Sequence, residues 1–152
     1  MITNWDLRYI ELAKHISTWS KDPSTKVGAV ITFRNRVISI GFNGLPRGIA
    51  DTEERLNDKS LKYAMTVHGE MNAILHANRD LRGATLYTYP FMPCSVCAAK
   101  IIQTGIVRVV APYNDNERWS ESFKITEAMF NEVNITLDVL HTLLEDMEIG
   151  HD

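Results

Sequence analysis

Two short stretches decide how this chain folds and what it holds: His68-Gly69-Glu70 and Pro93-Cys94-Ser95-Val96-Cys97. A histidine and a close pair of cysteines supply three ligands that suit Zn²⁺. Three protein ligands leave the fourth position of the metal open to water, which is typical of a catalytic zinc and not of a closed structural one. Glu70 lies two residues from His68, so we expect it beside the metal as an acid/base group and not as a fourth ligand.

The ordered combination of these two stretches is much more specific than either stretch alone, because Cys-x-x-Cys pairs also occur in redox sites. Cys94 follows a proline and lies 26 positions after His68. This completes the H-x-E…P-C-x-x-C signature of zinc nucleobase deaminases, in which the glutamate moves protons. Two other interpretations, a redox cysteine pair and a helical histidine beside two buried cysteines, leave Glu70 without a role.

Length and composition indicate an ordinary globular protein. The chain has 152 residues, of which 45% are hydrophobic and 23% charged, so we expect one domain over residues 1–152. No apolar run approaches the length of a membrane-spanning helix, and the first residues do not resemble a signal peptide. We therefore expect a cytoplasmic protein (in the host cytoplasm if phage-encoded) without a membrane partner. The net charge of −3 and the lack of a Lys/Arg cluster also argue against a nucleic-acid partner.

Hydrophobic periodicity predicts alternating helices and strands. Thr3 and Asp6 fit a capping box at the start of the first helix, Arg34-Asn35 fits a hairpin turn, and Gly105 fits a helix C-cap. We expect helices over residues 3–20, 67–79, 94–104, 117–131 and at the C-terminal end, and strands over 27–33, 37–42, 84–89, 107–111 and 135–139. This order predicts a three-layer α/β/α domain with a mixed five-stranded sheet.

Two further segments carry expectations about packing. An apolar stripe on the first helix is expected to pack on the sheet: Trp5, Tyr9, Leu12, Ala13 and Ile16. Residues 49–66 form a long polar segment, which we expect to be a loop. A connection of this length is either a functional element, such as an effector site, oligomer contact or lid, or a solvated loop.

The predicted helices explain why these residue types suit the chemistry. His68 and the two cysteines fall at helix N-termini, where unpaired N–H groups favour a thiolate. Zinc held there would activate a water molecule for attack on C4 of a cytosine ring, or on the equivalent carbon of a purine. Glu70 would accept the proton of that water and deliver protons to the ring nitrogen and to the leaving amine.

The chain resembles the deoxycytidylate (dCMP) deaminases of the cytidine deaminase superfamily. Four blocks across most of residues 20–110 carry the resemblance: DPSTKVGA (22–29), GFNGLPRG (41–48), HGEMNAI (68–74) and PCSVC (93–97). The zinc motif is common to the superfamily, and the first two blocks distinguish the dCMP branch. The resemblance implies a cytidine deaminase-like fold and zinc-dependent hydrolysis of dCMP to dUMP and ammonia, which supplies dTMP synthesis.

The resemblance also implies roles for individual residues. Lys26 would contact the 5′-phosphate of the substrate, as would Tyr113. Asn43 would hydrogen-bond the deoxyribose hydroxyl, and the Gly69 backbone would contact the pyrimidine edge. A solvated charge at Lys26, a turn cap at Asn43 and ordinary packing at Tyr113 are the alternatives. An effector site would include a turn-rich segment with Asn43, Gly44, Arg47 and Gly48.

Regulation and assembly are further implications of the resemblance. Many members of the family are activated by dCTP and inhibited by dTTP, with Mg²⁺ bound by the effector phosphates. Members are homo-oligomers, commonly hexamers. Some relatives hold a second, structural zinc through extra cysteines, but both cysteines of this chain lie in the catalytic motif. We therefore expect one Zn²⁺ per subunit.

Other functions remain open at this point. Gly69 stands where relatives commonly have alanine, so a looser base pocket and a 5-substituted dCMP substrate are one alternative. Others are a deaminase of free cytidine or cytosine, of tRNA adenosine or of a pterin, and a non-catalytic zinc module that senses nucleotides. Lys26 and the second block favour a phosphorylated substrate, and Glu70 favours catalysis.

Overall fold

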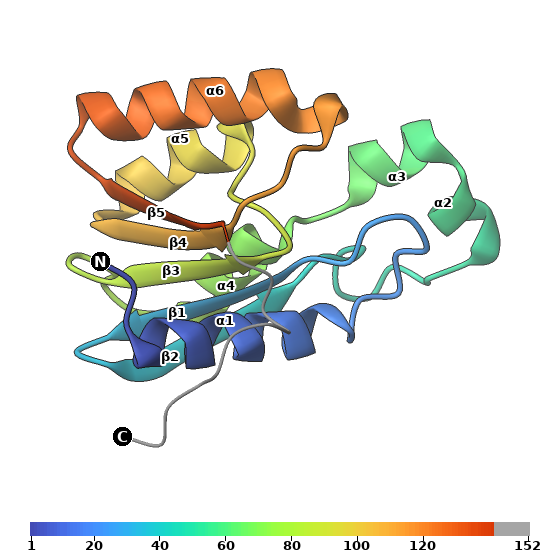
Figure 1. The fold of residues 1–152 in the computed structure, drawn as a ribbon. Helices are drawn as coiled ribbons and strands as arrows, with labels where there is room; N and C mark the ends of the chain where they lie inside the picture. The colour runs from blue at the N-terminus through green and yellow to red at the C-terminus, as the bar shows by residue number, and fades with distance from the viewer. Residues whose placement is uncertain (142–152) are drawn as a thin grey trace.

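The computed structural model describes residues 1–141, which form one five-stranded sheet with helices on both faces (Figure 1). The strand order is β2-β1-β3-β4-β5. β1 pairs antiparallel with β2 and β3, whereas β3, β4 and β5 are parallel, so the expected mixed sheet is confirmed. The strands are β1 (Gly28–Phe33), β2 (Arg36–Phe42), β3 (Thr85–Tyr89), β4 (Arg108–Pro112) and β5 (Thr136–Leu140).

Alternating side chains of the strands build the two sides of the core. Leu86 of β3 belongs to a cluster with α4, α5 and α6, and the next residue, Tyr87, belongs to a cluster with α1. Successive strand residues point to opposite faces of a sheet, so period-two patterning produces three layers. The helices of these layers are α1 (Asn4–Ser17), α4 (Gly69–Ala77), α5 (Ser95–Thr104) and α6 (Glu117–Glu132). Within residues 1–141 no helix is long and apolar enough to cross a membrane.

The first helix begins as predicted and ends earlier. The Asp6 N–H donates to Thr3 Oγ1 at 3.2 Å and the Thr3 N–H donates to Asp6 Oδ2 at 2.8 Å, which confirms the capping box. The expectation that Trp5 packs on the sheet is wrong, because its side chain is 46% exposed. The Trp5 ring lies 5.9 Å from the Tyr9 ring, and the Arg8 guanidinium lies over the Trp5 ring at 4.5 Å.

The polar segment 49–66 is not the loop that we expected, because it contains α2 (Glu53–Asn57) and α3 (Lys59–Met65). Side-chain caps start both helices: Thr52 Oγ1 accepts from Arg55 N and Asp58 Oδ1 accepts from Leu61 N. Such caps satisfy N–H groups that the first helical turn leaves unpaired. The helix expected at the C-terminal end lies outside the described residues.

The chain path places the starts of α4 and α5 at the same end of the central strands, where β1 begins and β3 ends. Gly28 at the start of β1 is paired with Tyr89 at the end of β3, and α5 follows β3 directly. After β2, Gly44 and Val67 exchange two backbone hydrogen bonds of 2.8 and 3.1 Å, which brings residue 68 beside the same strand ends. The parallel pairing of β3 with β4 requires the crossover that α5 provides.

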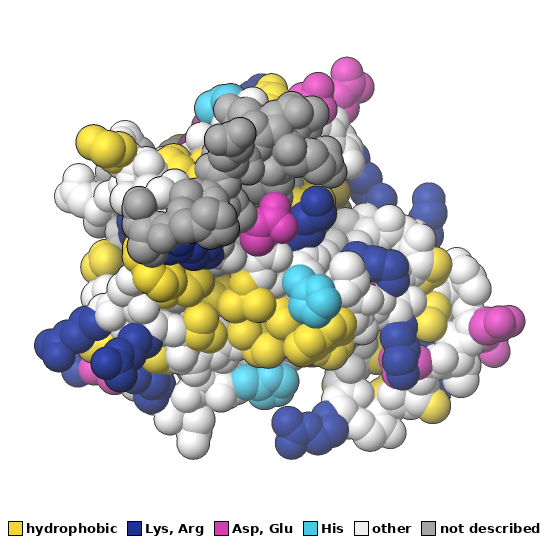
Figure 2. Space-filling view, turned by 60° about the horizontal axis from the view of Figure 1, so that its bottom comes forward, with side chains coloured by type: hydrophobic (Ala, Val, Ile, Leu, Met, Phe, Trp, Pro, Cys, Tyr) yellow, Lys and Arg dark blue, Asp and Glu magenta, His cyan; other side chains and the backbone are white. Residues whose placement is uncertain are grey.

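Exposed hydrophobic side chains gather on the face formed by α1 and β2 (Figure 2). Trp19, just after α1, and Phe42 at the end of β2 are both exposed. Their rings meet edge to face with centroids 6.1 Å apart, and the His15 ring lies 5.8 Å from the Trp19 ring. In the described part of the chain β2 is also an edge strand of the sheet, so this face offers apolar surface beside a sheet edge to a partner.

Candidate active site

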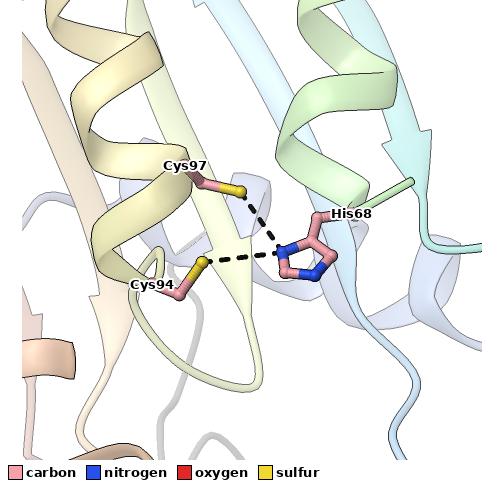
Figure 3. Close-up of side chains that lie close together, drawn as sticks. All are labelled: His68, Cys94 and Cys97. Carbon is pink, nitrogen blue, oxygen red and sulfur yellow. Dashed lines mark hydrogen bonds between the residues drawn. The ribbon is translucent and has the colours of Figure 1, made fainter. Parts of the chain in front are cut away.

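Helix N-termini hold the three expected metal ligands. His68 is the N-cap of α4 and Cys94 is the N-cap of α5, both with extended backbone, and Cys97 lies in the first turn of α5. We expected His68 inside the first helical turn, but it lies immediately before the helix. Neither capping side chain bonds the helix backbone, so both remain directed toward each other (Figure 3).

The three side chains have the geometry of a metal site. His68 Nδ1 lies 3.3 Å from Cys97 Sγ and 3.6 Å from Cys94 Sγ, and all three ligand atoms lie within 4.8 Å of one another (Figure 3). Tetrahedral zinc with ordinary Zn–S and Zn–N bonds would separate sulfur from nitrogen by about 3.5 Å. The donor atoms present therefore fit zinc, and within residues 1–141 no other such group of three metal-ligating side chains occurs.

Glu70 lies beside these ligands as a buried carboxyl group. Its side chain is 3% exposed, and its Oε2 atom has no hydrogen-bond partner among the described residues. Burial raises the pKa of this carboxyl group, because a low-dielectric surrounding disfavours the charged form. Buried polar atoms are nearly always hydrogen-bonded in folded proteins, so an unpaired oxygen at this position marks a place for a ligand or a water molecule.

Hydrogen bonds and burial shift the pKa values of the two cysteines and the histidine. The hydrogen bond from the Cys97 thiol, with a further one from His68, lowers the pKa of Cys94 to about 4 despite burial. The same hydrogen bond and burial raise the pKa of Cys97. The Cys94 sulfur also raises the pKa of His68. A metal entering this site must therefore displace protons from Cys97 and His68.

A pocket leads to these side chains. His68, Glu70 and Cys94 form one part of its wall. The rest of the wall comes from the segment before β1, from residues that follow β2 and β3, from α3 and the residue after it, and from the start of α6. The remaining lining residues are Asp22, Ser24, Thr25, Val27, Asn43, Lys62, Tyr63, Thr66, Phe91, Arg118 and Trp119.

Asn43 lines this pocket, as the predicted sugar contact requires. Its Oδ1 accepts from the Val27 N–H and its Nδ2 donates to the Thr25 carbonyl, both at 2.8 Å. The amide therefore holds the entry into β1. A side-chain amide has two N–H donors and two acceptor lone pairs, so one of each remains for a ligand.

The structure does not leave open space at Gly69. A Cβ atom there would lie 3.2 Å from both Val27 Cγ1 and the Val27 carbonyl oxygen. Val27, which precedes β1, already packs closely against Gly69. The expectation that the missing methyl group loosens the base pocket is therefore not supported.

Lys26 and Tyr113, the two residues predicted to contact phosphate, lie outside the pocket lining. The Lys26 side chain is exposed and its Nζ donates to the Ser20 carbonyl oxygen. Tyr113 is 55% exposed, and its ring stacks on the His141 ring at 5.0 Å in a separate hollow. Of the segment predicted to bind an effector, Gly44 pairs with Val67, and Arg47 and Gly48 are exposed.

Sequence reasoning missed two cationic residues of the pocket, Lys62 and Arg118. Lys62 had no visible signal, because it is one lysine in a polar segment that we expected to be a loop. Arg118 had a weak one, because a cation in the first turn of the predicted helix 117–131 opposes the helix dipole. Their place in the pocket depends on how α3 and α6 pack against the entry into β1.

Comparisons with known proteins agree with this geometry. The family model described as "Cytidine and deoxycytidylate deaminase zinc-binding region" matches residues 3–112. An uncharacterized deaminase of Aliivibrio fischeri is 45% identical over 138 residues, covering 89% of this chain and 92% of that protein. The deoxycytidylate deaminase of Mus musculus is 35% identical over 141 residues, covering 83% and 78%. The dCMP deaminase of cyanophage S-TIM5, solved with dCMP and dUMP, shares the fold with a TM-score of 0.72 and 20% identity, covering 92% of this chain and 99% of that one.

Proposed function

Since this chain belongs to the cytidine and deoxycytidylate deaminase family of zinc-binding enzymes, we propose that it hydrolyses dCMP to dUMP and ammonia. One observation carries the proposal: the buried Glu70 carboxyl group, with one oxygen unpaired among the described residues, lies beside His68, Cys94 and Cys97 at a pocket. The deoxycytidylate deaminases among its relatives support the choice of substrate.

In this reaction three residues would bind the metal and one would transfer protons. His68, Cys94 and Cys97 would hold one zinc ion per subunit, which when bound supplies the polarisation that makes a water molecule nucleophilic. Glu70 would take a proton from that water and give protons to ring N3 and to the C4 amino group. A C–O bond forms at C4 and the C–N bond breaks, so water and dCMP become dUMP and ammonia.

The rest of the substrate would lie along the pocket. Asn43 would use its remaining N–H or lone pair on the deoxyribose hydroxyl group, since its other groups already bond Val27 and Thr25. The backbone at Gly69, between His68 and Glu70 in the chain, would contact the pyrimidine edge. Such contacts would fix the ring with C4 facing Glu70.

Regulation and assembly form a second part of the proposal. We propose activation by dCTP and inhibition by dTTP, with Mg²⁺ on the effector phosphates, at a site that includes the Asn43–Gly48 segment. The exposed Arg47 supports it, because it offers a cation to phosphates. We also propose a homo-oligomer, commonly a hexamer in this family, and the apolar face of α1 and β2 supports self-association. A cytoplasmic location is proposed with the same function, because a nucleotide substrate would be met there.

A turnover assay with four substrates tests the proposal. Deamination is followed by ultraviolet absorbance for dCMP, deoxycytidine, CMP and 5-methyl-dCMP, each with and without dCTP-Mg²⁺ and dTTP. We expect dCMP to be preferred over deoxycytidine. Absence of turnover with all four, in protein that holds one zinc per chain, would contradict the proposal and favour a non-catalytic nucleotide sensor.

A further inference from the structure

We propose that Arg118, at the start of α6, recognises the 5′-phosphate and thereby selects nucleoside monophosphates over nucleosides. The inference rests on the proposed function for the identity of the ligand. Its evidence is the distribution of charge around the pocket, which the family resemblance did not provide.

Apart from the candidate metal ligand His68, the basic side chains among the pocket-lining residues of the described chain are Lys62 and Arg118. The charge of Lys62 is already matched, because its Nζ lies 3.0 Å from Asp22 Oδ1 and 3.1 Å from Ser24 Oγ, in a buried setting. Arg118 has no carboxylate partner within residues 1–141. Arg118 is therefore the pocket cation whose positive charge is not already paired with a carboxylate, and a phosphate dianion would bind there.

Two aromatic rings lie close to the Arg118 guanidinium. Its central carbon lies 5.1 Å from the Tyr63 ring centroid and 5.3 Å from the Trp119 ring centroid. Contacts with aromatic faces engage the flat face of a guanidinium, and its N–H groups lie in its plane. Within residues 1–141 no acceptor bonds these N–H groups, so a fork of donors remains available for two phosphate oxygens.

Arg118 is also poorly placed for a purely structural role. It lies in the first turn of α6, where the partial positive charge of the helix end disfavours a cation. A phosphate bound at this point would be attracted both by the side chain and by the helix end. The position therefore suits ligand binding better than helix stability.

The rival candidate for the phosphate is Lys26, which the resemblance indicates. Both Lys26 and Arg118 are exposed, but Lys26 bonds the Ser20 carbonyl oxygen and does not line the pocket, whereas Arg118 does. The two assignments therefore predict opposite results for the Arg118→Ala and Lys26→Ala variants.

The test is calorimetric binding of dUMP and of deoxyuridine to the zinc-loaded full chain. Arg118→Ala should weaken dUMP binding by about 10- to 100-fold, the range expected for loss of a charge-assisted hydrogen bond, and leave deoxyuridine binding unchanged. The dUMP affinity of Arg118→Lys should fall between those of the wild type and Arg118→Ala, because lysine keeps the positive charge but lacks the paired N–H donors of the guanidinium. Lys124→Ala is the matched control: this α6 cation is paired with Glu121 at 3.2 Å and lies outside the pocket, so both affinities should stay within about twofold.

Each other outcome has a definite meaning. Loss of dUMP affinity in Lys26→Ala but not in Arg118→Ala would overturn the inference and assign the phosphate to Lys26. Equal weakening of dUMP and deoxyuridine in Arg118→Ala would overturn it in favour of a structural role. If the wild type binds dUMP but deaminates no substrate, the proposed function fails while the Arg118 comparison still decides the inference. If it binds neither compound, both fail.

Discussion

Lys62 Nζ lies 3.0 Å from Asp22 Oδ1, and both side chains are buried, although 40 residues separate them in the chain. Asp22 Oδ1 also accepts hydrogen bonds from the backbone N–H groups of Ser24 and Thr25. One carboxylate thus joins α3 to the segment that enters β1. Because both elements line the pocket, this ion pair shapes the binding site.

Breaking this pair should be costly. Lys62→Met should lower the free energy of unfolding by about 3–5 kcal/mol, because it leaves the Asp22 charge buried and uncompensated. Lys21→Met is the control: its ion pair with Asp51 is as short, at 3.1 Å, but exposed, and should contribute at most about 1 kcal/mol. Urea denaturation of the zinc-loaded proteins measures both values. Equal effects of the two variants would show that the Lys62 pair has no special role.

The role of Glu70 predicts a separation of metal binding from turnover. Glu70→Gln should keep the zinc content of the wild type and lower the turnover of dCMP by about 10²–10⁴-fold, because the amide cannot transfer protons. Metal analysis and the absorbance assay measure the two quantities on the same sample. Full turnover in the Glu70→Gln variant would refute the acid/base assignment.

Zinc affinity should depend on pH with a predictable sign. Cys97 and His68 both have a pKa above the ordinary value, so zinc has to displace their protons. Between about pH 5 and about pH 8 the affinity should therefore rise with pH, more steeply below the pKa of His68, where two protons are displaced, than above it, where only the Cys97 proton remains. Competition with a chromophoric chelator measures it. Constant affinity across this range would show that zinc displaces no protons from Cys97 and His68. Two zinc ions per chain would contradict the single site.

A second buried charge network should make stability sensitive to acid. Burial opposes ionisation of Asp6, but hydrogen bonds from Arg108, at 2.7 and 3.0 Å, and from Tyr87 prevail and lower its pKa to about 2. The unfolded value is near 4, so this carboxylate contributes about 2 kcal/mol above about pH 4, which is lost as the pH falls from about 4 to about 2.

Asp6→Asn tests this acid dependence. The difference in unfolding free energy between the wild type and this variant should shrink by about 2 kcal/mol between about pH 5 and about pH 2. Comparing the two proteins at each pH by urea denaturation cancels the effect of acid on the metal site. A difference that does not change with pH would show that Arg108 and Tyr87 stabilise the carboxylate no better than water does.

Much of the fold and the metal site could be predicted from the residues themselves. His68, Cys94 and Cys97 were identified because ligand type and spacing are local properties, and the structure brings their donor atoms within 4.8 Å. The Arg34-Asn35 turn was identified for the same kind of reason, and both residues adopt the positive φ angles of a tight hairpin. The strands were visible because alternation of side chains follows directly from the geometry of an extended chain.

The sequence by itself determined the layers of the fold, the candidate metal ligands and the glutamate beside them, because periodicity and ligand chemistry act over short distances in the chain. The tertiary structure alone decided that Trp5 is exposed, that residues 49–66 form two capped helices and that Lys26 lies outside the pocket. It also decided which cation is compensated: Lys62 meets Asp22, and Arg118 meets aromatic rings. The physical reason is that burial and charge pairing depend on neighbours from distant parts of the chain, which no local pattern specifies.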